Sequence, residues 1–398
     1  MNLDLKIKNL LFICLIFLGV FNHYYSQTQY KDCFKTGADR PELYLPLLKG
    51  KTIGVVTNQT GLMNDKTHLV DFLVKNNIKI KSIFAPEHGF RGDADAGEKV
   101  KNGVDVKTGI PIVSLYGKNK KPTPEQLKGI DVVVFDIQDV GVRFYTYIST
   151  LTYIMEAGAE NDVEVIVLDR PNPHDGYVDG PVLKKKWTSF VGMHEVPVVY
   201  GLTIGEYGKM VNGEKWLKSG VQAKYTLIPM LNYHKKQRYQ ISDKPSPNLP
   251  NDKAINLYPS LCFFEGTQVS VGRGTDLPFQ IYGSPWTSGL PYKFTPKPGS
   301  GAKDPFLNGR LCYGENLSDY PHDLRELNLE WVIKAYKNYK NPDQDFFLKN
   351  LWFDTLSGTD ELRKQIIAGK SITEIKASWK TDLENFEKIR TKYIVYEN

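Results

Sequence analysis

Four short polar segments contain the side chains best suited to catalysis in this sequence. The first, Phe84–Gly92, reads FAPEHGFRG and brings Glu87 and His88 together with an arginine behind a rigid proline. A glutamic acid in such a turn can serve as a general acid if its surroundings favour the protonated form, and the flanking phenylalanines would do so by excluding water. The alternative is a surface turn in which Glu87 only pairs with the arginine. The local sequence leaves both interpretations equally open.

The second segment, Asp136–Arg143, offers two carboxylates directly after a β-branched run. Asp136 points either into a ligand crevice or into the core, and it is a catalytic candidate. Asp139 belongs either to the site or to the cap of a helix that begins near Arg143, a common role for aspartate.

The remaining two segments are Asp169–Pro173 and Glu265–Gly274. The sequence DRPNP either orients substrate hydroxyls or forms a proline-stiffened turn with an internal ion pair. Glu265 is a candidate second carboxylate, because glycoside hydrolysis usually needs two. Arg273 is a candidate partner of an anionic substrate group, because its planar guanidinium matches a carboxylate bidentately.

Regular secondary structure has to position these segments, and the first half of the chain alternates between strand and helix patterns. Strands are predicted at Lys51–Thr57, Ile78–Ala85, Ile110–Tyr116, Val132–Ile137 and Glu164–Asp169. Helices are predicted near Asp65–Lys75, from a capping box at Thr123, and through the apolar spacing from Phe144 to Met155. This alternation predicts a Rossmann-like, doubly wound parallel sheet. Such sheets bind ligands outside the carboxyl ends of their strands, where Asn58 and the first three polar segments lie. Glu265 and Arg273 would have to reach the cleft from the second half of the chain.

After about Gly213 the pattern changes to a second, smaller mixed α/β domain. One more strand is predicted at Ala223–Met230, and the segment Pro245–Pro259, rich in proline and asparagine, is expected to be a linker or a long ordered loop. Amphipathic helices are predicted near Leu324–Tyr339, Thr359–Ala368 and Leu383–Tyr393. The expected domains are residues 37–215, carrying the catalytic sheet, and residues 216–398, contributing to the cleft.

The first residues predict export. Lys6 and Lys8 precede an apolar run from Leu10 to Phe21. This run of about 12 residues suits a signal peptide and is shorter than the ~20 residues that span a bilayer. Ser26 is a small residue suitable for cleavage, so residues 1–26 are predicted to be removed. The mature protein is expected in the periplasm, or secreted, without stable membrane insertion.

Charge, cysteine content and turn sequences argue against several partners and cofactors. The net charge of +6 is spread along the chain, which makes a nucleic-acid partner improbable. Cys33, Cys262 and Cys312 remain after cleavage, an odd number that does not suit a disulfide-built scaffold, although one bridge stays open. The turn Asn58–Gly61 contains no dinucleotide fingerprint and no phosphate-binding loop, and no zinc-ligand spacing occurs. We therefore expect no metal and no other cofactor.

Taken together, the polar segments resemble the NamZ-type, or YbbC-like, exo-β-N-acetylmuramidases. The resemblance rests on six runs in one order, VTNQTG, FAPEHGFRG, FDIQDVGVRFYTY, LDRPNP, EGTQVSVGRGT and YGSPW, and covers the chain from about residue 37 onward. It implies an exported glycosidase with a Rossmann-like N-terminal domain and a smaller C-terminal domain. Members of this family release N-acetylmuramic acid from the non-reducing end of peptidoglycan fragments. The implied partners are peptidoglycan-derived disaccharides and muropeptides.

The resemblance makes Glu87 the leading general acid, in a cleft between the two domains. The further catalytic candidates are His88, Asp136 and Glu265. N-Acetylmuramic acid carries a lactyl carboxylate, which calls for a cation such as Arg143, Arg170 or Arg273. The other predicted contacts with the substrate are Asn58, Gln138, Tyr147 and Asn172. The 2-acetamido group of the sugar is a potential internal nucleophile, so a second carboxylate could orient that group instead of attacking.

Two other functions remain open. A metal-dependent hydrolase would need His88, Asp136 and His194 to meet, although no two of them have the spacing of ligands on one helix face. A two-lobed periplasmic protein that binds muropeptides or sugars would have the same sheets without catalysis. Turnover of an N-acetylmuramyl-N-acetylglucosamine disaccharide would separate the expected glycosidase from the binding protein.

Overall fold

Runs of β-branched residues in the first half form the strands of one large sheet. The computed structural model describes residues 34–87, 89–90, 102–237, 239–241, 243–299, 301–321 and 323–397. The strands follow the order β3-β4-β2-β1-β5-β6-β7, and every neighbouring pair is parallel except β3 with β4. Their bounds are Thr52–Thr57 for β1, Lys79–Ala85 for β2, Gly103–Val104 for β3, Pro111–Ser114 for β4, Val132–Asp136 for β5, Glu164–Leu168 for β6 and Tyr225–Ile228 for β7. The predicted doubly wound parallel sheet is confirmed.

Alternating side chains of the central strands enter two separate cores, one on each face of the sheet. On β5, Val132 and Val134 pack on one face, and Val133 and Phe135 pack on the other. Because both faces are covered, the strand is apolar throughout, as is typical of parallel sheets. The first face is covered by α2 (Pro41–Leu48) and α3 (Leu69–Lys75), and the second by α4 (Pro124–Leu127), α5 (Tyr147–Glu160) and α6 (Ile204–Gly213).

Local capping decides where these helices begin. The predicted capping box of α4 is present, with the Thr123 hydroxyl accepting from the Gln126 N–H. Of the two alternatives for Asp139, the cap of a helix near Arg143 is wrong, because α5 begins only at Tyr147. Asp139 instead accepts hydrogen bonds from the Gly141 N–H at 2.7 Å and from a tyrosine hydroxyl. Gly141 has φ +70°, which turns the chain before it reaches the helix.

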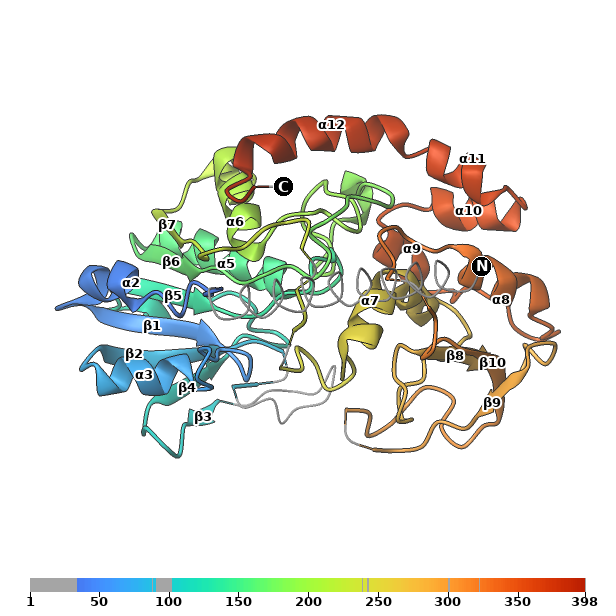
Figure 1. Ribbon diagram of the computed structural model, residues 1–398, viewed down its shortest axis with the longest axis horizontal. Coiled ribbons are helices and arrows are strands. Elements are labelled where there is room, and N and C mark those ends of the chain that lie inside the picture. Colours follow the sequence, from blue (N-terminus) through green and yellow to red (C-terminus); the bar gives the residue numbers. More distant parts are fainter. Residues whose placement is uncertain are drawn as a thin grey trace, which may run out of the picture.

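The second half forms a smaller antiparallel sheet, in the order β8-β10-β9, together with the C-terminal helices, at the right of Figure 1. Its strands are Ile281–Ser284 (β8), Tyr292–Phe294 (β9) and Cys312–Asn316 (β10). Its helices are α7 (Asp252–Leu261), α8 (Glu330–Asn338), α9 (Trp352–Ser357), α10 (Glu361–Ile367), α11 (Ile372–Ala377) and α12 (Lys380–Arg390). The predicted mixed second part is confirmed, but β7, which follows residue 215, belongs to the large sheet.

The expectation of a loop throughout Pro245–Pro259 is wrong, because α7 begins inside it. The side chain of Asn251 accepts from the Ala254 N–H and caps the helix. Pro259 lies near its end, where α7 passes into the 3-10 turn η3 (Cys262–Gly266). An asparagine that suggested a loop by composition therefore starts a helix.

The end of the chain returns to the large sheet. Helix α12 runs back across the top of the molecule, and the C-terminus lies beside α6 (Figure 1). The Tyr396 hydroxyl donates to Asp169 at 2.6 Å, and the Val395 N–H donates to Glu206 at 2.7 Å. Burial raises the pKa of Asp169 to about 6. Asp169, from the DRPNP segment, is thus a structural link between the sheet and the C-terminal residues.

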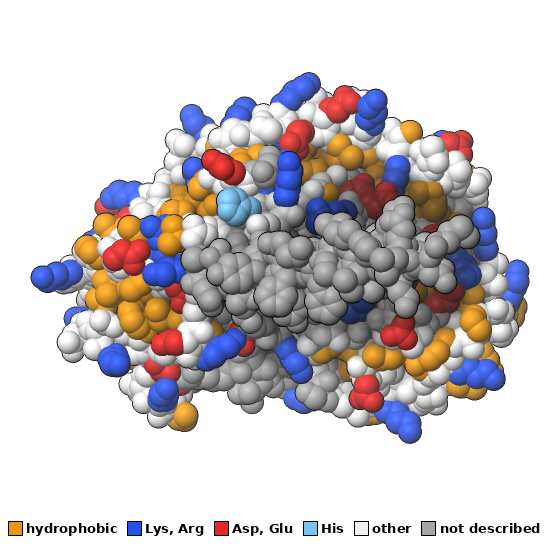
Figure 2. All heavy atoms as spheres, in the orientation of Figure 1, with side chains coloured by type: hydrophobic (Ala, Val, Ile, Leu, Met, Phe, Trp, Pro, Cys, Tyr) orange, Lys and Arg blue, Asp and Glu red, His pale blue; other side chains and the backbone are white. Residues whose placement is uncertain are grey.

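The described residues bear only in part on three predictions, which concern the signal peptide, the cysteines and the distribution of charge. No helix among the described residues is long and apolar enough to cross a membrane, and the predicted signal peptide lies outside those residues. Cys262 and Cys312 are buried free thiols, and Cys33 lies outside the described part. On the face shown in Figure 2, the described acidic and basic side chains are interspersed around the rim.

Candidate active site

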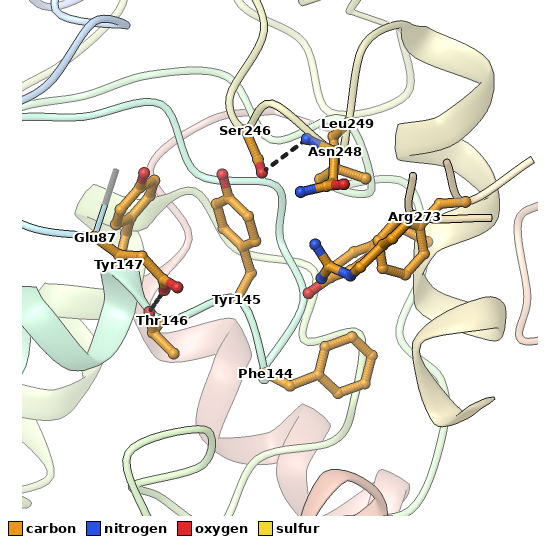
Figure 3. Close-up of a pocket in the computed structure, with 11 residues that line it drawn as sticks. Glu87, Phe144, Tyr145, Thr146, Tyr147, Ser246, Asn248, Leu249 and Arg273 are labelled. Atoms are coloured by element: carbon orange, nitrogen blue, oxygen red, sulfur yellow. Dashed lines mark hydrogen bonds between the residues drawn. The ribbon is translucent and has the colours of Figure 1, made fainter. Parts of the chain in front are cut away.

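A cavity of about 70 Å³ lies between the loops that follow β2 and β5 and the segment around α7. It is lined by Glu87, Phe144, Tyr145, Thr146, Tyr147, Ser246, Asn248, Leu249, Tyr258, Arg273 and Phe279. Glu87 and Arg273 reach it from opposite sides, with Tyr145 between them (Figure 3). Of the predicted site residues, the structure brings Glu87, Tyr147 and Arg273 together here.

Glu87 is half-buried and accepts hydrogen bonds from two hydroxyl groups. Tyr116, just beyond β4, donates to Oε1 at 3.2 Å, and Thr146 donates to Oε2 at 3.5 Å. Thr146 is the N-cap residue of α5 but makes no side-chain capping bond, so its hydroxyl is available to Glu87. Hydroxyls can donate to a carboxylate or accept from a carboxylic acid. These two contacts therefore suit a residue that has to act in both protonation states.

The tyrosines nearest to Glu87 remain protonated phenols. Burial, followed by the Glu87 charge, raises the pKa of both Tyr116 and Tyr147. The Asn58 side chain donates to the Tyr147 hydroxyl at 2.8 Å and fixes its position. Asn58 is fully buried at the end of β1 and does not line the cavity itself. This predicted substrate contact therefore supports the cavity wall through Tyr147.

The expected role of Phe84 and Phe90 is wrong, because neither lines the cavity. Phe84 packs in the core on one face of the sheet, and Phe90 packs in the core on the other. Phe84 lies on β2, whereas Phe90 lies beyond the strand, after a turn in which the Gly89 N–H donates to the Pro86 carbonyl, and this turn separates the two side chains. The aromatic lining of the cavity comes from other residues, Phe144, Tyr145, Tyr147, Tyr258 and Phe279.

Asp136 and Arg170, both predicted site residues, pair with each other and do not line the cavity. Arg170 Nε and Nη2 donate to the two Asp136 oxygens at 2.5 and 2.9 Å. The Asp136 side chain is 0% exposed and that of Arg170 6%. Burial opposes the charge of Arg170, but Asp136 outweighs it and raises the pKa of the guanidinium. The pair lies at the end of β5, beside β1, where the strand order reverses.

Arg143, a predicted contact of the lactyl carboxylate, is fully buried and bound to the backbone. Its Nη1 donates to the carbonyls of Pro181 and Val196, and its Nη2 donates to those of Leu356 and Ser357. Burial lowers its pKa to about 9, which still leaves the side chain cationic at neutral pH. Arg143 thus joins the loops after β6 to α9 and lies outside the cavity lining.

Gln138 and Asn172 also hold loops in place. The Gln138 amide donates to the Pro171 carbonyl at 2.6 Å, and the Asn172 amide donates to the Leu202 carbonyl at 2.8 Å. A Cβ at Gly141 would lie 1.9 Å from the Asn172 amide oxygen, so the close approach requires glycine there. Both side chains are buried and neither lines the cavity.

Arg273 lines the cavity, and Glu265, which does not, binds its guanidinium. Arg273 Nε donates to Glu265 Oε1 at 2.8 Å, and the guanidinium lies 4.9 Å from the centre of the Phe279 ring. Within the described part of the chain, the Nη1 atom is buried and has no hydrogen-bond partner. Glu265 itself is not among the lining residues. Only the arginine of this pair faces the cavity.

The alternative metal site gains no support from the two described members of its ligand set. Asp136 is bound to Arg170, whereas His194 Nδ1 lies 2.9 Å from the Tyr207 hydroxyl and its ring stacks on Trp216. Burial lowers the pKa of His194 to about 4, so the imidazole is neutral. His88, the third member and a catalytic candidate, lies outside the described residues.

A second hollow, of about 370 Å³, opens beside α3. It is lined by Gln59, Leu62, Lys66, Thr67, His68, Asp71 and Lys107. Two of its lysines already form ion pairs, Lys66 with Asp243 and Lys107 with Asp71. None of the predicted site residues lines it, so the smaller cavity at Glu87 is the candidate active site.

Models of one protein family match almost all of the chain beyond its first residues. The N-terminal model of the exo-β-N-acetylmuramidase NamZ matches residues 53–253, and the C-terminal model matches residues 256–396. The chain belongs to the NamZ family. The predicted family and the predicted enzyme class, a glycoside hydrolase, are confirmed.

Individual NamZ relatives agree with this assignment. The peptidoglycan β-N-acetylmuramidase NamZ of Bacillus subtilis is 39% identical over 393 residues, which cover 93% of each chain. Two crystal structures of DUF1343 family proteins from Bacteroides fragilis are also similar. One has a TM-score of 0.83 at 46% identity and the other 0.78 at 31%, and each comparison covers 92% of this chain and 99% of the solved one.

Several cavity residues were missed by the sequence analysis. Tyr145 and Thr146 stand in the segment that supplied Tyr147, but nothing in the spacing separates a lining residue from a core residue. Ser246 and Asn248 lie in the stretch interpreted as a linker, where asparagine suggested only a turn. Tyr116 follows a strand and could have been found by the rule that ligands bind at strand ends.

Proposed function

We propose that this chain hydrolyses the glycosidic bond that follows a non-reducing N-acetylmuramic acid in peptidoglycan fragments, with Glu87 as the general acid. One observation carries the assignment: among the described residues that line the cavity, Glu87 is the only carboxylic acid. A general acid must reach the oxygen of the leaving group, and a lining carboxyl can do so. Family membership and the peptidoglycan β-N-acetylmuramidase activity of the Bacillus subtilis relative support the substrate class.

The proposed reaction uses the substrate's own acetamido group as the nucleophile. Its carbonyl oxygen bonds to the anomeric carbon while Glu87 protonates the departing glycosidic oxygen. Water then attacks the anomeric carbon and loses a proton to the Glu87 carboxylate, which reopens the ring formed by the acetamido group and restores the acid. Substrate-assisted hydrolysis of this kind needs no second nucleophilic carboxylate. The hydroxyls of Tyr116 and Thr146 support Glu87 in both steps, because they can donate or accept.

Arg273 is the proposed partner of the lactyl carboxylate. Of the three arginines considered, Arg143 binds four backbone carbonyls and Arg170 binds Asp136. Arg273 alone among these three lines the cavity, and its Nη1 is unpaired among the described residues. The charge-assisted contact places the lactyl side of the sugar toward α7 and its leaving group toward Glu87.

The sequence supports two further parts of the proposal. Residues 1–26 are proposed to direct export to the periplasm, where disaccharides and muropeptides would be the substrates. Residues 37–215 are proposed to carry the catalytic sheet, and residues 216–398 to complete the cleft by supplying Arg273.

The decisive test is Glu87→Gln, which keeps the shape of the side chain but cannot donate the proton. We expect turnover of N-acetylmuramyl-N-acetylglucosamine to fall by roughly 10²–10⁴-fold. An aryl N-acetylmuramide with an acidic leaving group needs little protonation, so its cleavage should fall much less. Near-full activity of a normally folded Glu87→Gln enzyme on the disaccharide would refute the assignment.

Glu214→Gln is the matched control. Glu214 also accepts a hydrogen bond from a tyrosine hydroxyl, that of Tyr393 at 2.8 Å, but it does not line the cavity. This variant should retain the wild-type rate on both substrates. If wild-type protein binds the disaccharide without cleaving it, the alternative of a binding protein is favoured instead.

The exo mode of action is tested with intact peptidoglycan. Release of free N-acetylmuramic acid without internal fragments is expected, because an exo enzyme acts only on chain ends. A rapid loss of turbidity in a cell-wall suspension would indicate cleavage within the chains and would contradict this part of the proposal.

A further inference from the structure

Glu265 and Arg273 come from two turns of the second half that lie side by side. Glu265 belongs to η3, and Arg273 lies between two glycines with left-handed backbone, Gly272 and Gly274. The Arg273 side chain is 24% exposed and that of Glu265 27%, so water screens the pair only in part. Burial opposes the arginine's charge, but Glu265 outweighs it and raises the pKa of the guanidinium.

Two contacts fix the direction in which the guanidinium points. The Glu265 carboxylate binds the Nε edge, and the Phe279 ring lies below the guanidinium group. An arginine presents five N–H donors in a rigid fork, so binding of the Nε edge leaves the Nη side facing away from Glu265. Nη1 is buried and has no partner in the described chain, and the side chain lines the cavity. The donors that Glu265 does not bind thus lie on the other edge of a guanidinium whose side chain lines the cavity.

Glu265 is itself held by the end of α7. The thiol of Cys262 lies 3.6 Å from Glu265 Oε2 and donates to it, while Oε1 receives the arginine. Burial, then the Glu265 charge, raises the pKa of that thiol, so it remains a neutral donor. Each carboxylate oxygen thus has a donor behind the cavity wall, which leaves Glu265 poorly placed to attack or protonate a sugar.

We propose that Glu265 is a positioning residue that aims Arg273 at the lactyl carboxylate and thereby sets the preference for N-acetylmuramic acid over sugars without an acidic group. This inference rests on the proposed function, in which Arg273 binds that carboxylate. It replaces the expectation that Glu265 is a second catalytic carboxylate. A positioning residue acts only through the group it orients, so its effect disappears when that group is absent.

The experiment compares two aryl glycosides that share one leaving group. One is the β-N-acetylmuramide, with its lactyl carboxylate, and the other is the same sugar with the carboxylate converted to a neutral carboxamide. For Arg273→Ala we expect the KM of the acidic substrate to rise by roughly 10–100-fold, with at most a small change for the amide. Glu265→Ala should likewise affect mainly the acidic substrate. Its KM for that substrate should rise by roughly 5–50-fold, with little change in kcat.

Two further variants distinguish positioning from chemistry and from folding. Glu265→Gln keeps an oxygen that can accept from Arg273 Nε, so its KM should rise less than that of Glu265→Ala. The double variant Arg273→Ala/Glu265→Ala should be no worse than Arg273→Ala alone. The matched control is Glu387→Gln, which alters a Glu–Arg pair on α12, with Arg390 Nε at 2.8 Å, outside the cavity lining.

Each failure has a distinct signature. A loss of kcat in Glu265→Gln comparable with that of Glu87→Gln would make Glu265 catalytic and overturn the inference. Equal losses on both substrates, or additive losses in the double variant, would show a structural role and overturn it as well. If Arg273→Ala changes the selectivity but Glu265→Ala does not, positioning fails and the proposed function stands. If the wild type cleaves neither substrate, the proposed function fails.

Discussion

Two regions at the carboxyl edge of the large sheet contain the same kinds of side chain in opposite situations. The cavity wall holds Glu87 and Arg273, which are partly exposed. The buried polar layer, which we define as Asp136, Asp139, Arg143, Asp169 and Arg170, is almost fully enclosed. Glu87 accepts hydrogen bonds from hydroxyl groups, and Arg273 Nη1 has no partner among the described residues. Asp136 and Arg170, in contrast, form an ion pair with each other. Access to the cavity, more than residue type or strand position, distinguishes the candidate site from its support.

This comparison predicts that changes in the buried polar layer alter stability, while changes at the cavity wall alter catalysis. Asp136→Ala should have the largest effect, because it leaves the Arg170 guanidinium buried without its partner. We expect a loss of about 3–5 kcal/mol in the free energy of unfolding, measured by urea denaturation. Removing both charges with Asp136→Ala/Arg170→Met should recover part of the loss. Unchanged stability of the single variant would remove the distinction between the two regions.

Arg143→Lys is the next largest change. Lysine keeps the charge but cannot reach all four backbone carbonyls that the guanidinium binds. Buried carbonyls left without donors should lower the free energy of unfolding by roughly 2–4 kcal/mol. The acid-to-amide selectivity of the surviving enzyme should stay at the wild-type value, in contrast to Arg273→Ala. A lost preference for the acidic substrate would instead place Arg143 in substrate binding.

Asp139 predicts a specific dependence of stability on pH. Burial raises its pKa in the folded protein to about 6, above the ordinary value near 4. The folded state therefore holds a proton that the unfolded state has released, and the associated stability, full below about pH 4, is lost as the pH rises through 6. The free energy of unfolding of the wild type should therefore decline between about pH 4 and pH 7. In Asp139→Asn this decline should be smaller by on the order of 2–3 kcal/mol. The exposed Asp382→Asn is the control, and equal slopes for wild type and Asp139→Asn would contradict the prediction.

Tyr116→Phe should have the smallest effect and should be confined to catalysis. It removes one hydroxyl that donates to Glu87, worth about 0.5–1.5 kcal/mol, so kcat/KM should fall roughly 2–10-fold. The control is Tyr393→Phe, which removes the corresponding bond to Glu214. A kcat/KM equal to that of the wild type would show that the Tyr116 hydroxyl does not act on Glu87.

The sequence predicted the large sheet because its signals are local. Strands β1, β5 and β6 and the second half of β2 are buried on both faces, and the helices between them begin at capping residues such as Thr123. It predicted α7 poorly, because Asn251 and Pro259 are as common in loops as at helix ends. The boundary at residue 215 stays a prediction, although the two family models meet between residues 253 and 256.

The sequence could not predict which candidate side chains are already bound to residues far away along the chain. Glu87 and Arg273 stood out by type and by the family resemblance, and both line the cavity. Asp136, Arg143 and Arg170 stood out equally, yet each is bound by groups contributed from distant segments, up to 214 positions away for Arg143. Only the folded arrangement shows which charged groups are already paired.

The return of the chain end to Asp169 has a consequence for biosynthesis. Asp169 receives the Tyr396 hydroxyl across 227 positions of sequence. At about 5–20 residues per second, roughly 10–45 s separate the synthesis of these two residues. Throughout that interval the growing sheet lacks one donor to a buried carboxylate and the backbone donor from Val395 to Glu206. The large sheet is the first part to be made but among the last to be completed, so the nascent chain stays easier to unfold until translation has almost ended.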